Sequence, residues 1–111
     1  MKADIKRLWV EDLIANPELQ GRGQLKTEEG KFCCLGRLCA LYQKETGNGE
    51  WNHGFKCSEE DHSFFLLPNA VQRWAGLESA SPLVDDHPLA SYNDELKKTF
   101  PEIAALIEEY L

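Results

Sequence analysis

The sequence predicts a single small α+β domain, mostly helical, with about four helices around a central, buried, cysteine-rich helix and a minor β-hairpin. Three observations lead to this prediction. The chain has 111 residues, enough for one domain (residues 1–111) and hardly for two. Most of its apolar residues recur at helical spacing, and one segment is apolar nearly all round. Only one stretch, around a turn at residues 52–54, has the pattern of a hairpin.

The first predicted helix covers residues 3–15. Its apolar residues fall mainly on one face, at Ile5, Leu8, Trp9 and Leu13. Pro17 pushes Asn16 out of helical geometry, so the helix is expected to end there. The stretch 18–31 that follows is polar and contains three glycines, which predicts loops and a turn near Gly30.

The second predicted helix, residues 32–45, is the most hydrophobic segment and is expected to lie at the centre of the fold. Gly36 inside it costs about 1 kcal/mol relative to alanine. Its most direct benefit would be to let another element approach closely. Gly47 or Asn48 is a suitable residue to end the helix.

Shorter elements are expected in the middle of the chain. Residues 50–57 predict a hairpin, and residues 58–63 an acidic loop. A third helix is expected to start at Pro68, which is tolerated in a first turn, and to end at Gly76.

The C-terminal part predicts a long connection and one well-capped helix. Residues 78–88 hold two prolines and no periodicity, which indicates a loop, and residues 89–92 a single helical turn. Thr99 and Glu102 have the spacing of a capping box, so the last helix is expected to begin there. Its predicted apolar face consists of Ile103, Leu106, Ile107, Tyr110 and Leu111.

Charge and hydropathy limit the classes of partner. The formal net charge is −7, with residues 1–57 close to neutral and residues 58–111 carrying a net charge of −8. This balance argues against binding long nucleic acids, which needs cations facing phosphates. No apolar run approaches the length of a membrane span, and the start of the chain lacks a signal peptide. We therefore expect a cytoplasmic protein that does not bind a membrane.

The four cysteines predict no metal site and no cofactor. Cys34 and Cys39 are five residues apart on a predicted helix, about 140° around it, so they cannot chelate one ion together. Buried thiols that pack as small apolar groups are the favoured interpretation. One alternative stays open: Cys33, near the start of the central helix, could be an activated nucleophile. Its base would have to be one of His53, His62 and His87, none of which stands in a known motif.

A glycine-containing basic segment predicts binding of a small anion. Glycines let a backbone approach a ligand, and the start of the central helix near Gly30 would offer free N–H groups. Arg22, Lys26 and Lys31 would hold phosphates, and Trp51 would stack on a base, although core packing is the commoner use of tryptophan. Asn93 and Asp94 form a further polar pair, for which a turn or cap is the alternative. The candidate ligand-binding residues are Gln20, Arg22, Lys26, Lys31, Trp51, Asn93 and Asp94.

The order of landmarks along the chain resembles a family of small proteins encoded by bacteriophages and prophages. The most specific of these landmarks is the Cys-Cys-Leu-Gly-x-Leu-Cys core at residues 33–39. The resemblance implies a phage accessory protein that acts in the bacterial cytoplasm, and it carries over no catalytic residue. In the sequences that this one resembles, the position of Arg37 is usually apolar, so the sequence leaves its role open.

Two main hypotheses for function follow. In the first, a non-enzymatic phage protein sequesters a small anionic nucleotide signal and so blunts host defence. In the second, the acidic surface of residues 58–111 docks on a basic host protein as an inhibitor or adaptor. A cysteine-dependent enzyme built on Cys33 is the third and weakest. The length of the chain is also compatible with a homo-oligomer.

Overall fold

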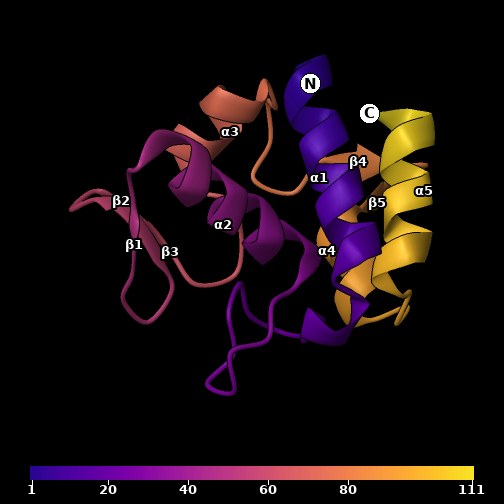
Figure 1. Ribbon diagram of the computed structural model, residues 1–111, viewed down its shortest axis with the longest axis horizontal. Helices are drawn as coiled ribbons and strands as arrows, with labels where there is room; N and C mark the ends of the chain where they lie inside the picture. The colour runs from indigo at the N-terminus through magenta and orange to yellow at the C-terminus, as the bar shows by residue number, and fades with distance from the viewer.

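Five α-helices and two small antiparallel sheets make up the fold in the computed structural model, which describes residues 1–111 (Figure 1). The helices are α1 (Ala3–Ala15), α2 (Cys34–Thr46), α3 (Asn69–Ala75), α4 (Leu89–Asp94) and α5 (Phe100–Tyr110), with a 3₁₀ turn at Pro17–Leu19. The α+β class predicted from the sequence is confirmed. None of the helices combines the length and the apolar character needed to span a bilayer.

The cysteine-rich helix α2 is central, as predicted. Its buried residues are Cys34, Leu35, Gly36, Leu38, Cys39, Leu41 and Tyr42. Helices α1, α3 and α4 pack directly against it, and the indole of Trp9 on α1 donates a hydrogen bond to the carbonyl of Cys34, at 3.0 Å. A Cβ at Gly36 would overlap the carbonyl oxygen of Leu25. The close approach that the glycine predicted is therefore made by the loop before the helix.

The first and the last helix pack side by side (Figure 1). Helix α1 contributes Ile5, Trp9 and Leu13 to the core, and α5 contributes Ile103 and Ile107, all of them buried. The predicted capping box is present: the Thr99 hydroxyl accepts from the N–H of Glu102, and the Glu102 carboxylate accepts from the N–H of Thr99. The prediction that Tyr110 belongs to the apolar face of α5 is wrong, because its side chain is 46% exposed.

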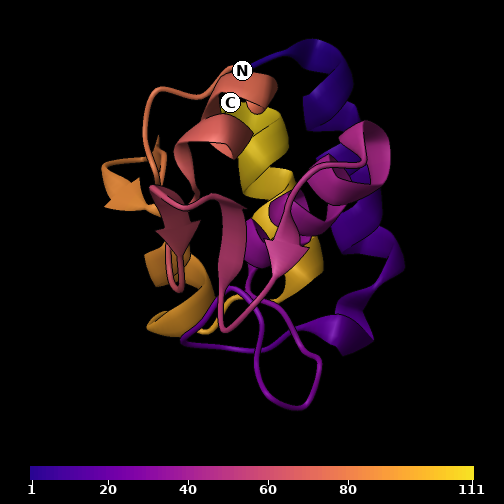
Figure 2. The same cartoon turned by 90° about the vertical axis from the view of Figure 1, so that its left-hand side faces the viewer.

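The three-stranded sheet lies on the opposite side of α2 from the α1–α5 pair, and Figure 2 views the molecule from that side. Its strands are β1 (Glu50–Trp51), β2 (Phe55–Ser58) and β3 (Asp61–Ser63), in that order. The predicted hairpin corresponds to β1 and β2. The prediction of a loop over residues 58–63 is wrong, since β3 pairs with β2 there. The carboxylate of Asp61 also accepts from the N–H groups of Asn69 and Ala70, at 2.7 and 2.9 Å, and so joins β3 to the start of α3.

Several other boundaries differ from the prediction. Helix α3 begins at Asn69, with Pro68 as its N-cap, and α4 continues to Asp94, beyond the predicted residues 89–92. Strands β4 (Leu83–Val84) and β5 (His87–Pro88) form a hairpin where a loop was expected. Its turn consists of Asp85 and Asp86, both with positive φ, at 50° and 68°. Helix α2 begins at Cys34 rather than at residue 32, and Cys33 is its N-cap.

Candidate ligand-binding site

Four of the predicted ligand-binding residues meet in one hydrogen-bonded cluster, which we call the Gln20–Asn93 clamp. Its members are Gln20, Arg22, Asn93 and Asp94. The amide nitrogen of Gln20 donates to Oδ1 of Asn93 at 3.0 Å, and Nε of Arg22 donates to the carbonyl of Asn93 at 3.1 Å. Asp94 Oδ1 accepts from the backbone N–H of Gly23 at 3.0 Å. Residues more than 70 positions apart in the sequence are joined in this way.

The clamp satisfies its polar groups within the protein. Asn93 is fully buried, and its amide nitrogen donates to the carbonyl of Gly21 at 2.9 Å and to Asp94 at 2.8 Å. Gln20 accepts from the N–H of Phe100 with its side-chain oxygen. Because these groups already hold the loop against α4 and α5, the clamp positions the chain and does not line a cavity. A ligand-binding role for its residues stays a prediction.

The predicted anion site at the start of the central helix is closed. Cys33, Cys34, Leu35 and Gly36 are buried there, and the backbone at Leu25 covers Gly36. Lys31 does not point toward a ligand, because its ammonium group donates to the carbonyl of Glu18. The expectation that free N–H groups near Gly30 and Lys31 would hold a phosphate at this helix is therefore not supported by the geometry.

Arg37 has a structural partner. Its guanidinium makes two hydrogen bonds to the carboxylate of Asp12 on α1, at 2.7 and 2.8 Å, and lies 4.7 Å from the centre of the Phe32 ring. Both charged side chains are largely shielded from solvent. The pair ties α1 to α2, which gives a role to the residue that the sequence left unexplained.

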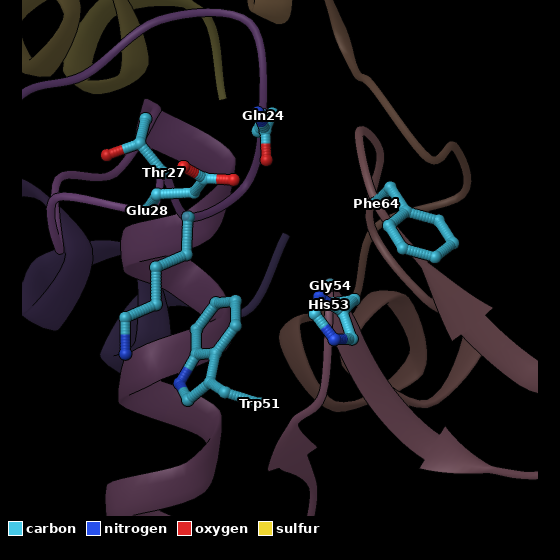
Figure 3. Close-up of a pocket in the computed structure, with 8 residues that line it drawn as sticks. Gln24, Thr27, Glu28, Trp51, His53, Gly54 and Phe64 are labelled. Carbon is cyan, nitrogen blue, oxygen red and sulfur yellow. The ribbon is translucent and has the colours of Figure 1, made fainter.

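Lys26 and Trp51, the two remaining candidates, line one cavity of about 450 Å³. This size is in the range of small-molecule sites. The cavity opens between the loop before α2 and the β1–β2 hairpin, with Phe64 at its far side (Figure 3). Its other lining residues are Gln24, Thr27, Glu28, His53, Gly54 and Phe64.

The charges of the cavity are not neutralised by the protein. The ammonium of Lys26 lies 5.3 Å from the centre of the Trp51 ring and 5.6 Å from that of Phe32, and it makes no ion pair. The two ion pairs of the structure are Arg37–Asp12 and Lys56–Glu59. A cation held over aromatic faces without a carboxylate partner is available to an anionic ligand.

Six of the eight lining residues were not among the predicted site residues, His53 and Phe64 among them. His53 lies in the predicted hairpin turn with a positive φ of 48°, and Phe64 belongs to an exposed apolar run. Leu25 donates its backbone N–H to the carbonyl of Phe64 at 2.9 Å, which brings this run to the basic loop. The sequence holds no signal that marks Phe64 as a site residue, because the exposure of an aromatic side chain cannot be read from the sequence alone.

The cysteines are packed rather than presented to a substrate. Cys33, Cys34 and Cys39 are buried, and Cys57 is half-buried. Burial raises the pKa of the Cys33 thiol to about 12, the direction opposite to that expected for a nucleophile at a helix start. The Cys33 sulfur accepts from the N–H of Gly36 as a helix cap. No three side chains of His, Cys, Asp or Glu are grouped as metal ligands would be.

Comparison with known proteins identifies the family but not an activity. No curated protein matches the chain, and no solved structure matches it. A family model with the description "Domain of unknown function" matches residues 1–111, the whole of the sequence. The chain therefore belongs to the family DUF8296, whose function its description leaves open.

Proposed function

We propose that the chain is a non-enzymatic binding protein that sequesters a small, anionic, nucleotide-like ligand in the Lys26–Trp51 cavity. The observation that carries this proposal is the combination of an unpaired ammonium group with aromatic walls around about 450 Å³ of space. Pockets of this size lined by aromatic groups and a few polar ones are the usual form of small-molecule sites.

Each part of a nucleotide has a counterpart among the lining residues. Lys26 supplies the charge for a phosphate. The Thr27 hydroxyl oxygen accepts from the N–H of Lys31 at 3.1 Å and points away from the cavity (Figure 3), so it stabilises the loop and does not contact the ligand. Trp51 and Phe64 offer aromatic surface to a base, and Phe64 is 45% exposed.

The loop that carries Lys26 is held in place before a ligand arrives. The N–H of Leu25 donates to Phe64, and the N–H of Thr27 donates to the carbonyl of Lys31 at 2.8 Å. The clamp fixes the same loop at Gly23. A loop ordered in advance lowers the entropic cost of binding, which supports a binding role for the cavity.

The biological setting of this proposal comes from the resemblance to phage and prophage proteins. We place the protein in the cytoplasm of a bacterial host, where removal of a nucleotide signal would blunt a defence response. Neither a membrane nor a long nucleic acid is part of this proposal.

The proposal is tested by thermal unfolding with nucleoside monophosphates and cyclic dinucleotides. A ligand at 100 times its Kd stabilises the folded state by about 2.7 kcal/mol, which raises the Tm by about 10 °C for a domain of this size. Lys26→Met should weaken binding of any stabilising nucleotide about tenfold or more, because it removes a charged hydrogen bond.

The matched control is Lys44→Met, which removes the same charge from an exposed position on α2 that lies outside the cavity. No shift of the Tm with any nucleotide at millimolar concentration would refute the proposed function. Equal weakening by both lysine variants would show that net charge, and not the cavity, governs binding.

A second candidate function is favoured by one surface. Phe64, Phe65 and Leu66 are 45%, 60% and 42% exposed, in the half of the chain that carries the net charge of −8. An exposed apolar patch on a chain of net negative charge fits a basic host protein. In a pulldown from bacterial lysate, Phe65→Ser should reduce capture of such a partner, while Ile14→Ser, at an exposed residue elsewhere, should not. Capture that is insensitive to high salt would contradict an electrostatic partner.

A further inference from the structure

Glu28 is the unexpected member of the cavity. Its carboxylate makes no ion pair and no hydrogen bond in the structure, although it lines the same space as Lys26. Figure 3 shows the Glu28 carboxylate turned toward the side of the cavity where Gln24 lies, above the Trp51 ring. A carboxylate repels a phosphate, so a site that served only to bind anions would gain nothing from it. Glu28 is exposed to solvent, so its carboxylate is free to accept from a second, hydrogen-donating part of the ligand.

A carboxylate is an acceptor-only group with two oxygens side by side, and it is best satisfied by two neighbouring N–H donors. Among the common bases, guanine alone presents such a pair on one edge, at N1–H and the N2 amino group. Adenine and cytosine each place a ring nitrogen acceptor beside their single amino group. Uracil places carbonyl oxygens on both sides of its N–H. Each of these would set an acceptor against the Glu28 carboxylate.

Gln24 offers a partner for the third polar group on the same edge of guanine. It is exposed and lines the cavity, and its side-chain amide has no hydrogen-bond partner in the protein. In Figure 3, Gln24 and Glu28 lie on the same side of the cavity, and His53 and Phe64 lie across from them. The amide can donate to O6 of guanine, the acceptor that adjoins N1–H. The two side chains together provide one donor and a paired acceptor, the complement of the guanine edge.

We infer that the cavity selects a guanine nucleotide, with the base edge at Glu28 and Gln24 and the phosphate at Lys26. The inference rests on the proposed function and names the class of its ligand. The aromatic side chains Trp51 and Phe64 supply sequence-tolerant contact with the base, so they do not discriminate among nucleotides. Discrimination comes from Glu28.

The test is a calorimetric titration of the full chain with GMP, IMP and AMP. Hydrogen bonds to a charged group are strong enough that GMP should bind about tenfold or more tightly than AMP. IMP, which keeps N1–H but lacks the N2 amino group, should fall between the two. Glu28→Gln places an amide N–H₂ against the guanine donors, so it should bring the ratio of the GMP and AMP affinities close to one.

Glu29→Gln is the matched control, since Glu29 is exposed like its neighbour Glu28 but does not line the cavity. It should leave the preference for GMP unchanged. Circular dichroism of both variants checks that they are folded. Equal affinity for GMP and AMP would overturn the guanine inference and leave the proposed function standing, as would an unchanged preference in Glu28→Gln. Absence of binding by all three nucleotides and by cyclic dinucleotides would overturn the proposed function itself.

Discussion

Replacement of Asn93 by alanine separates a structural clamp from a ligand site. The substitution removes three hydrogen bonds made by a fully buried side chain, with Gln20, Gly21 and Asp94. Gln20 keeps a second acceptor, the carbonyl of Lys98 at 2.7 Å, and Asp94 keeps the N–H of Gly23. The carbonyl of Gly21 loses the donor that the structure gives it.

The expected cost follows from this inventory. A carbonyl left without a partner costs about 1–3 kcal/mol, and the other two lost bonds contribute about 0.5–1.5 kcal/mol each. Part of this cost is recovered, because Gln20 still donates to the carbonyl of Lys98 and Asp94 still accepts from the N–H of Gly23. We therefore expect Asn93→Ala to lower the free energy of unfolding by about 2–4 kcal/mol. With a urea m-value of about 1.5 kcal/mol/M, the midpoint should fall by roughly 1.3–2.7 M.

Urea unfolding followed by tryptophan fluorescence measures this change. The control is Asn69→Ala, at an exposed residue whose side chain makes one long contact, 3.5 Å from Gln72. Its midpoint should move by less than about 0.5 M, because exposed substitutions of this kind have small effects. An Asn93→Ala variant with wild-type stability and lost binding of GMP would refute the reasoning and return Asn93 to the ligand site.

Two further predictions concern helix packing and capping. Gly36→Ala gains about 1 kcal/mol of helix propensity, but it sets a methyl group against the carbonyl of Leu25, at a cost of about 1–3 kcal/mol. We therefore expect urea unfolding to show a net decrease in the free energy of unfolding. A more stable variant would contradict the close contact between Gly36 and Leu25. The N–H and hydroxyl of Thr99 lower the pKa of Glu102 below its usual 4.5. A lowered carboxyl pKa stabilises the fold above the usual pKa, and the contribution is lost as the pH falls through the lowered value. Glu102→Gln should therefore lose less stability than the wild type between about pH 5 and pH 3, and a steeper loss would be the contrary result.

Local signals in the sequence were sufficient to place the ends of the first three helices and the start of the last one. Pro17 after α1, Gly47 after α2 and Gly76 after α3 mark the ends of these helices in the structure, because each acts on the backbone of its own neighbours. Both glycines adopt the left-handed conformation. The capping box at Thr99 was equally readable, since its two partners are three residues apart.

The missed strands lacked such signals. Strand β3 has no apolar alternation, and its place depends on Asp61 reaching the start of α3. The turn of the β4–β5 hairpin uses Asp85 and Asp86 with positive φ, without the glycine that usually marks this turn. Nothing short-range distinguishes these segments from loops.

For the candidate site, too, the sequence showed which residues are close along the chain but not which distant residues they contact. The sequence grouped Arg22, Lys26 and Lys31 because they are close along the chain. In the structure, Arg22 donates to the carbonyl of Asn93, and Lys31 donates to the carbonyl of Glu18. Lys26 lies beside the ring of Trp51. These assignments depend on partners distant in sequence, Asn93 being 71 positions from Arg22. Glu28 can be seen in the sequence, but the role proposed for it depends on Gln24 and Trp51 lining the same cavity.

The pairing of α1 with α5 has a consequence for how the protein is made. Met1 and Leu111 line the same shallow depression, so the two ends of the described chain lie together (Figure 2). Trp9 and Leu13 stay without part of their cover until Ile103 and Ile107 arrive, almost a whole chain length later. Folding on the ribosome therefore cannot be completed before α5 has left the exit tunnel, and premature termination before Phe100 would release a chain with an exposed core for proteases to remove.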